Sequence, residues 1–281
     1  MIQPVLKDDA FLADVRNANR DDDDFRLWWL GQSGFLVQWK GSHLLLDPYL
    51  SDSLTKKYAA TDKPHVRMTD RIVDPARLDF IDVVTSSHNH TDHLDGETLW
   101  PLLKTNSRLA MIAPEANCDF IAQRLSIDPS FPVGLHDGQV AIVGSFRFTA
   151  VPAAHEEVSP EFLGYVVAFG CWRIYHSGDT LLYDGMAERL RPFAVDVALL
   201  PINGRVPERR VAGNLSGAEA ARLAKAIGAR VVIPCHYEMF EFNTADPVEF
   251  VRTAESIGQP YRVLRCGERW ESTGLREAAI E

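Results

Sequence analysis

The stretch of this chain that decides its fold is Ser86-Ser87-His88-Asn89-His90-Thr91-Asp92-His93-Leu94-Asp95. It follows Ile81–Ser86, whose apolar and β-branched residues predict a buried strand. Because His88 and His90 are two residues apart, they project to the same side of an extended segment. Asp92 and His93 then fall on the turn into a helix expected near 95–104. The stretch can therefore present two imidazoles to one cation, and a carboxylate with an imidazole to a second.

This donor set favours a catalytic metal site over a structural one. Imidazole nitrogen and carboxylate oxygen suit Zn²⁺ foremost, with Mn²⁺ and Fe²⁺ as alternatives. The segment has no cysteine, whereas structural zinc sites usually close four positions with thiolates. The alternative interpretation is a polar, histidine-rich loop that binds no metal.

Three later residues that stand at predicted strand ends are candidates for the remaining ligands. His155 follows a strand expected at 145–151, Asp179 follows 172–176, and His236 follows 230–234. Loops at strand ends place functional groups on a rigid scaffold. A lone histidine such as His155 is more often a core or surface residue, so its position alone leaves its role open.

The stretch 88–93 matches the HxHxDH signature of the metallo-β-lactamase superfamily, which the chain resembles over most of residues 25–250. His155, Asp179 and His236 fall in the order of the later motifs of that superfamily. Within it, the chain is most similar to the L-ascorbate-6-phosphate lactonase group. That likeness is carried by residues 28–34, 78–95, 175–179, 195–199 and 229–236. The resemblance implies an α+β fold, a four-layer αβ/βα sandwich with the metal site at one edge of its two sheets.

The resemblance also implies seven metal ligands, carried over position by position. A first ion takes His88, His90 and His155, a second takes Asp92, His93 and His236, and Asp179 bridges them. The lactonase group does not regularly keep a histidine at the position of His155 and is expected to hold a single metal. The full set in this chain therefore favours two divalent metal ions. Asp47 matches an acidic position that braces a ligand histidine from behind, with a plain turn aspartate as the alternative.

Two cations would lower the pKa of a bridging water toward neutrality, and the resulting hydroxide would attack a carbonyl carbon or phosphorus. Asp92 is the predicted catalytic residue, which orients the hydroxide and takes its proton. His176, close to Asp179 in the sequence, is a second candidate, as a contact to substrate or to a ligand. A packed strand histidine is an equally good interpretation of His176.

Residues for substrate recognition are expected in two places. A loop after the strand predicted at 196–200 carries Asn203, Arg205 and Arg210, and arginines there suit a phosphate or carboxylate. A solvated charged loop is the alternative. Tyr237, beside His236, is expected to face the pocket, and segment 52–70 is a candidate lid because of its length and position.

Composition limits the classes of partner. The chain has 281 residues, a formal net charge of −10, and 46% apolar residues. An acidic chain argues against a broad nucleic-acid surface, which needs clustered Lys and Arg, but a small anionic substrate needs only a local group of cations. We expect no membrane span and no signal peptide. Four scattered cysteines fit a reducing compartment, so a cytoplasmic location is expected.

The sequence shows no Pro/Ser-rich linker and no repeat of 20–50 residues, so we expect one domain over residues 1–281. Residues 1–24 are expected to form an N-terminal extension that carries a helix at 7–19. Segment 52–78 is expected to be an irregular loop. Strands are further expected at 26–30, 34–39, 43–47, 108–113, 139–143, 164–169 and 261–265, and helices at 115–125, 183–191, 216–227 and 247–257.

The favoured function is a metal-dependent hydrolase that uses a metal-bound hydroxide on a small anionic substrate, a lactone. One alternative is a phosphodiesterase of the N-acyl-phosphatidylethanolamine phospholipase D type, and another is a non-catalytic metal-binding homologue. A homo-oligomer is suggested by family analogy alone. A non-catalytic homologue that acts as a regulator would bind metal but hydrolyse neither lactones nor bis-p-nitrophenyl phosphate.

Overall fold

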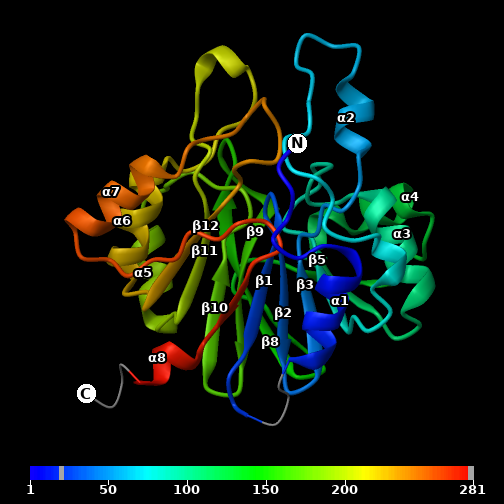
Figure 1. Cartoon of the computed structure of the whole chain (residues 1–281), viewed down its shortest axis with the longest axis horizontal. Helices are drawn as coiled ribbons and strands as arrows, with labels where there is room; N and C mark the ends of the chain where they lie inside the picture. Colours follow the sequence, from blue (N-terminus) through cyan, green and yellow to red (C-terminus); the bar gives the residue numbers. More distant parts are fainter. Residues whose placement is uncertain (19–21, 278–281) are drawn as a thin grey trace.

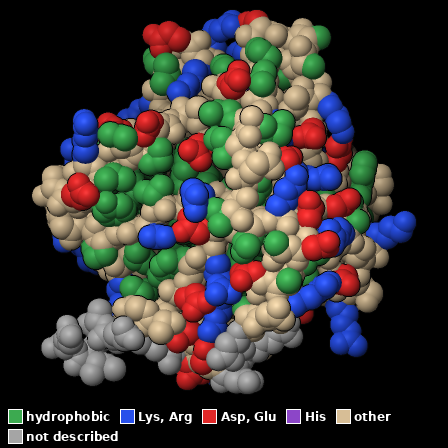
Figure 2. Space-filling model, viewed as in Figure 1, with side chains coloured by type: hydrophobic (Ala, Val, Ile, Leu, Met, Phe, Trp, Pro, Cys, Tyr) green, Lys and Arg blue, Asp and Glu red, His purple; other side chains and the backbone are tan. Residues whose placement is uncertain are grey.

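Two mixed β-sheets form the centre of the computed structural model, which describes residues 1–18 and 22–277 (Figure 1). Helices α5 (Met186–Leu190), α6 (Gly217–Ile227) and α7 (Val248–Ser256) lie to one side of the sheets, and α3 (Gly96–Thr105) and α4 (Cys118–Leu125) lie to the other. The sheets with their outer helices confirm the predicted α+β sandwich. Figure 2 shows acidic, basic and hydrophobic side chains interspersed over this face of the molecule.

The first sheet has seven strands in the order β13-β1-β2-β3-β4-β5-β6. Its strands β1 to β3 are antiparallel neighbours, whereas β3 to β6 run parallel. Parallel strands are covered on both faces, which explains why β4 and the end of β5 are continuously buried. The strands are β1 (Arg26–Gly31), β2 (Gly34–Trp39), β3 (Ser42–Leu46), β4 (Val83–Thr85), β5 (Ala110–Pro114), β6 (Pro132–Leu135) and β13 (Arg269–Glu271).

The second sheet has six strands in the order β12-β11-β10-β9-β8-β7. Strands β10 to β12 run parallel, so the ends of β10 and β12 lie at the same edge of this sheet. The strands are β7 (Val140–Val143), β8 (Phe146–Ala154), β9 (Val158–Phe169), β10 (Trp172–His176), β11 (Val197–Pro201) and β12 (Val231–Cys235).

The helices include several whose ends are fixed by local sequence. Helix α6 begins with a capping box between Ser216 and Glu219 and ends at Gly228, which adopts the left-handed conformation. Helix α3 begins after Asp95, whose side chain accepts from the backbone of Glu97. The α-helices are α1 (Asp8–Asn17), α2 (Ser53–Tyr58), α3 (Gly96–Thr105), α4 (Cys118–Leu125), α5 (Met186–Leu190), α6 (Gly217–Ile227), α7 (Val248–Ser256) and α8 (Thr273–Glu277).

One large apolar core joins the two sheets. Phe25 packs edge-on against Phe169 and Trp172 of the opposite sheet, with ring centroids 5.4 and 5.3 Å away. Helix α1 buries Phe11 and Val15 in the same core. The ends of the strands that carry the candidate site are therefore held by a rigid, close-packed interior.

Several expectations from sequence were wrong in detail. Segment 52–78 contains helix α2 and a 3-10 turn at Pro75–Arg77, so it is not an irregular loop throughout. The strand expected at 261–265 is a single bridge from Tyr261 to Val232, because this segment only touches the edge of the sheet at β12. Strands β6 and β13 were not anticipated, since both are short and largely lack apolar alternation. Residue 19 of the helix expected at 7–19 lies outside the described residues.

Among residues 1–18 and 22–277, no helix is long and apolar enough to cross a membrane.

Candidate metal centre

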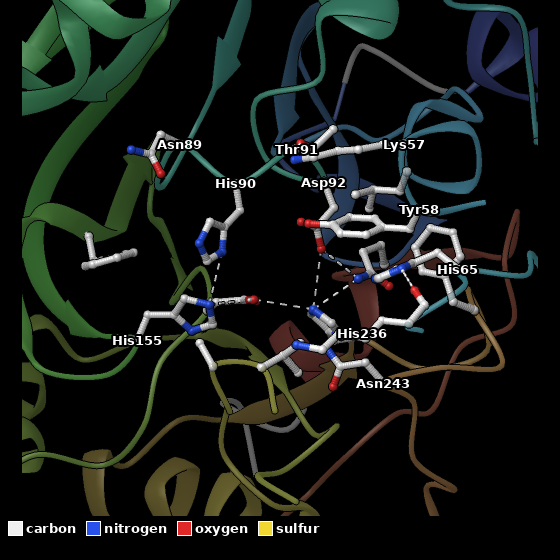
Figure 3. Close-up of a pocket in the computed structure, with 18 of the residues that line it drawn as sticks. Lys57, Tyr58, His65, Asn89, His90, Thr91, Asp92, His155, His236 and Asn243 are labelled. Carbon is white, nitrogen blue, oxygen red and sulfur yellow. Dashed lines mark hydrogen bonds and ion pairs between the residues drawn. The ribbon is translucent and has the colours of Figure 1, made fainter. Parts of the chain in front are cut away.

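Every residue expected to bind metal stands just beyond a strand or on the turn into a helix. His88 and His90 follow β4, and residues 92–93 lead toward α3. His155, Asp179 and His236 follow β8, β10 and β12. The packing of the two sheets brings these ends together, and Figure 3 shows His90, Asp92, His155 and His236 around one cavity.

The ligand atoms fall into two compact groups. In one group, ring nitrogens of His88, His90 and His155 lie within 4.8 Å of one another. In the other group, one ligand atom each of Asp92, His93, Asp179 and His236 lies within 4.8 Å of the others. Asp179 also reaches toward the first group, since its Oδ2 lies 3.8 Å from Nε2 of His155. The structure thus gathers all seven residues, with Asp179 between the two groups.

Several nitrogen and oxygen atoms of the cluster lack hydrogen bonds to one another and are suited to binding a cation. Among the described residues, Nε2 of His88 is buried without a hydrogen-bond partner, and Nε2 of His93 and Oδ1 of Asp179 lie 3.3 Å apart but form no hydrogen bond with each other or with another residue. Nδ1 of His90 faces Nε2 of His155 at 3.2 Å. Buried polar atoms without partners are costly. A bound cation in each group would satisfy these lone pairs, and the nitrogen and oxygen donors suit zinc, manganese or iron.

Asp47 holds one of the ligand histidines from behind. Its Oδ2 accepts from Nδ1 of His93 at 2.7 Å, while Thr85 Oγ1 and the Ser87 amide donate to Oδ1. Burial opposes ionisation, but the charge of His176 and the hydrogen bond from His93 lower the pKa of Asp47 to about 2. An ionised Asp47 keeps the proton of His93 on Nδ1 and leaves Nε2 free toward the cluster.

Replacing Asp47 by asparagine is therefore expected to weaken metal binding by roughly 10- to 100-fold. The amide would present N–H groups to Thr85, Ser87 or His93, all of which donate to Asp47. Titration against a chelating dye measures the effect. Asp74→Asn, at a 3-10 turn away from the cluster, is the matched control. Unchanged metal affinity in Asp47→Asn would show that Asp47 is a turn residue without a role in metal binding.

The pKa values of the ligand histidines differ between the two groups. Burial is the main cause that lowers the pKa of His88, His90 and His155, so these rings are neutral and ready to bind a cation. Burial also opposes a charged His93, but Asp179 and Asp92 raise its pKa well above the ordinary value. A cation would take the place of this proton, so binding should release protons.

Gln32 is a residue of the site that the sequence did not point to. Its Nε2 lies 2.8 Å from Oδ2 of Asp92 and 3.0 Å from Nε2 of His236. Its backbone has φ of 50°, and its carbonyl accepts from the indole of Trp29 and the amide of His236. A left-handed, non-glycine residue held in this way indicates a functional constraint. The only sequence signal is its place in stretch 28–34, one of the stretches that carry the resemblance to the lactonase group.

The structure corrects the catalytic role expected for His176. This ring is buried, and its Nε2 bonds to the carbonyl of Ser33 rather than facing the cavity. Tyr237 is also corrected: its ring packs 4.3 Å from that of Trp29, and its hydroxyl donates to the Leu264 carbonyl. Residues adjacent along the chain point in different directions, so closeness in sequence to Asp179 or His236 did not place either side chain in the cavity.

The substrate contacts expected from the loop after β11 are also corrected. Arg205 pairs with Glu219 at 2.7 Å beside the start of α6. Asn203 is buried and accepts the amide of Asn214. Arg210 forms an ion pair with Asp62, and its carbonyl accepts from Lys63. Arg210 therefore links its loop to segment 52–70 and is not one of the cavity-lining residues.

A cavity of about 580 Å³ opens over the cluster. Segment 52–70 forms one wall through Leu54, Lys57, Tyr58, Lys63 and His65, so this candidate lid does border the site. Apolar side chains and one further cation add to the lining, namely Phe120, Phe162, Val211, Phe240 and Arg124. Its other residues include Glu156, Asn89 and Asn243. The cavity thus combines cationic and apolar walls over an acidic, histidine-rich floor.

Comparison with known proteins defines the class of this chain. A model described as the beta-lactamase superfamily domain matches residues 43–237, which include all seven residues of the cluster. Together with the two sheets and the HxHxDH stretch, this match shows that the chain belongs to the metallo-β-lactamase superfamily and is a metal-dependent hydrolase.

Similar proteins identify the family to which this chain belongs within the superfamily. A UPF0173 metal-dependent hydrolase of Caldivirga maquilingensis is 31% identical, over 84% of this chain and 92% of the relative. The chain is therefore a member of the UPF0173 metal-dependent hydrolase family. Igni18, a metallo hydrolase of Ignicoccus hospitalis, is 25% identical, with a TM-score of 0.65. The match covers 88% of this chain and 98% of the Igni18 chain. An isothiocyanate hydrolase from Delia radicum gut bacteria shares the fold, with 18% identity and a TM-score of 0.69. The match covers 87% of this chain and 98% of that protein.

Proposed function

We propose that this hydrolase binds two divalent cations, with zinc as the first choice, and opens a small anionic lactone. The observation that carries the proposal is the pair of ligand groups joined by Asp179 beneath a single cavity. His88, His90 and His155 would hold one cation, and Asp92, His93 and His236 would hold the other. Bound cations supply a water nucleophile at neutral pH and neutralise the oxyanion that develops.

Asp92 would take the proton from the attacking water. Its side chain lies at the cavity floor and is 15% exposed, so it is within reach of substrate. Burial alone would raise the pKa of Asp92, but the charges of His93 and His236 and the hydrogen bond from Gln32 lower it. Asp92 is therefore a carboxylate that can accept a proton, and Gln32 fixes the direction in which it points.

The cationic wall supports an anionic substrate. Lys57 and Lys63 line the cavity, and the polar contacts of their ammonium groups are neutral oxygens, Thr91 Oγ1 and the Arg210 carbonyl. Neither of these partners is an anion, so they do not neutralise the two charges, and a carboxylate or phosphate can pair with them. The free thiols of Cys118, Cys171, Cys235 and Cys266 are consistent with a reducing compartment, so we place the activity in the cytoplasm.

Replacing Lys63 by methionine is expected to raise KM for γ-butyrolactone-γ-carboxylate by about tenfold, which corresponds to roughly 1.4 kcal/mol. KM for the neutral parent γ-butyrolactone should stay unchanged, because only the anion uses the charge. Lys104→Met, on the outer surface of α3, is the control. Equal effects on both lactones would contradict a charge-based role for Lys63.

A substrate screen separates the competing functions. Protein loaded with zinc, manganese or iron is assayed with the two butyrolactones and with bis-p-nitrophenyl phosphate. Lactone opening supports the proposal, whereas cleavage of the phosphodiester alone would favour a phosphodiesterase. Tight metal binding without either reaction would indicate a non-catalytic homologue.

A further inference from the structure

His65 stands across the cavity from His90 and His155, on the wall formed by segment 52–70 (Figure 3). Its ring is clamped by aromatic neighbours. Tyr58 stacks on it at 4.5 Å with an interplanar angle of 29°, and the rings of Phe240 and Phe242 each lie 5.2 Å away. The imidazole is thus rigidly placed among rings, although it belongs to neither ligand group.

A backbone contact selects which ring nitrogen of His65 is available. Nδ1 lies 2.9 Å from the carbonyl oxygen of Lys63. A carbonyl can only accept, so Nδ1 carries a hydrogen in both charge states of the ring. Nε2 is then the nitrogen that gains or loses a proton. A half-buried, oriented imidazole with one titrating nitrogen at a cavity wall is well suited to transfer a proton.

We propose that His65 is the general acid of this hydrolase and donates the proton on Nε2 to the leaving oxygen of the substrate. The inference rests on the proposed hydrolysis at the cluster. The water oxygen bonds to the acyl carbon and gives a proton to Asp92, while the carbon–oxygen bond of the ring breaks. The departing oxygen takes its proton from His65, which becomes neutral. Asp92 then releases its proton to solvent, and His65 regains one from solvent. The product is a hydroxy acid, so atoms and charges balance.

The surroundings of His65 agree with this role. Burial among the rings is the main cause that lowers its pKa, the hydrogen bond to Lys63 and the charge of Asp92 raise it, and Lys57 and His236 lower it. A lowered pKa makes the imidazolium a stronger acid toward a departing alkoxide. Lys57 and Lys63, on the same wall, are the residues proposed to bind the anionic group of the substrate, so the role of proton donor falls to His65.

The experiment compares two lactones that differ in their need for a proton. Dihydrocoumarin releases a phenolate, which leaves readily without one, whereas δ-valerolactone releases an alkoxide, which does not. We expect His65→Gln to lower kcat for δ-valerolactone about 100-fold and kcat for dihydrocoumarin by less than about threefold. Metal content, measured by elemental analysis, should equal that of the wild type. His136→Gln, at an exposed histidine that does not line the cavity, is the matched control.

Chemical rescue gives a second, independent readout. Imidazole added to His65→Ala should restore δ-valerolactone opening and leave dihydrocoumarin opening unchanged. Equal losses for the two lactones in both variants, without rescue, would overturn the role of His65 while leaving the hydrolase intact. Failure of the wild-type, metal-loaded protein on both lactones would instead overturn the proposed function, and this inference with it.

Discussion

Replacing Asp179 by alanine is expected to remove bound metal and hydrolysis together. Asp179 is the carboxylate between the groups: Oδ1 lies 3.3 Å from Nε2 of His93, and Oδ2 lies 3.4 Å from Nε2 of His236. Burial opposes its ionisation, but the charges of His236 and His93 hold the pKa of Asp179 well below the ordinary value. Loss of this anion leaves buried histidines facing one another without a common partner, so activity should fall roughly a thousandfold.

The measurement combines elemental analysis of the purified protein with the lactone assay. Asp179→Asn keeps the size of the side chain and removes only its charge, so it should lose metal even where the alanine variant folds poorly. Asp184→Ala, an exposed aspartate shortly after Asp179, is the control and should keep both properties. Full activity in a metal-free Asp179→Ala protein would overturn the metal mechanism.

Replacing His155 by alanine is expected to reduce the metal content from about two ions per chain to one. His155 is buried, and its Nε2 faces Nδ1 of His90 at 3.2 Å, as expected for two ligands of one cation. The second group contains no atom of His155, so its cation should remain. Elemental analysis with and without the substitution gives the count directly.

The outcome of the His155 experiment also bears on the substrate. His136→Ala, at an exposed histidine, controls for the general loss of an imidazole. Two ions falling to one would support a dinuclear centre and a broad hydrolase screen. One ion in both proteins would make His155 a bystander, and a mononuclear enzyme would direct the first assays to phosphorylated sugar lactones.

The polar stretch 88–95 and the strand before it were readable because their information is local. Two histidines at positions i and i+2 after a strand project to the same side, and an aspartate before a helix caps it, as Asp95 does. The same locality explains why most strands and helices lie close to their predicted positions. Short edge elements such as β13 escaped prediction because their pairing partners, not their own residues, stabilise them.

Roles that depend on side-chain direction were not readable. Tyr237 follows His236 directly, yet it points into the core, because His236 adopts a left-handed backbone with φ of 65°. Arg205 carries the charge expected of a substrate contact, but Glu219 across the loop neutralises it. Gln32 and His65 reach the cavity from segments far from 88–95 in sequence. No local pattern distinguishes them from surface residues.

The spacing of residues 88–93 by itself thus indicated a metal-binding stretch, and the resemblance of the sequence to the metallo-β-lactamase superfamily implied the fold and the remaining candidate ligands. Only the tertiary structure decided which strand ends meet, that Asp179 lies between two groups, and which side chains line the cavity. The physical reason is that these contacts join distant segments through the packing of two sheets. Their geometry is fixed by the shared core and not by any residue's neighbours in the chain.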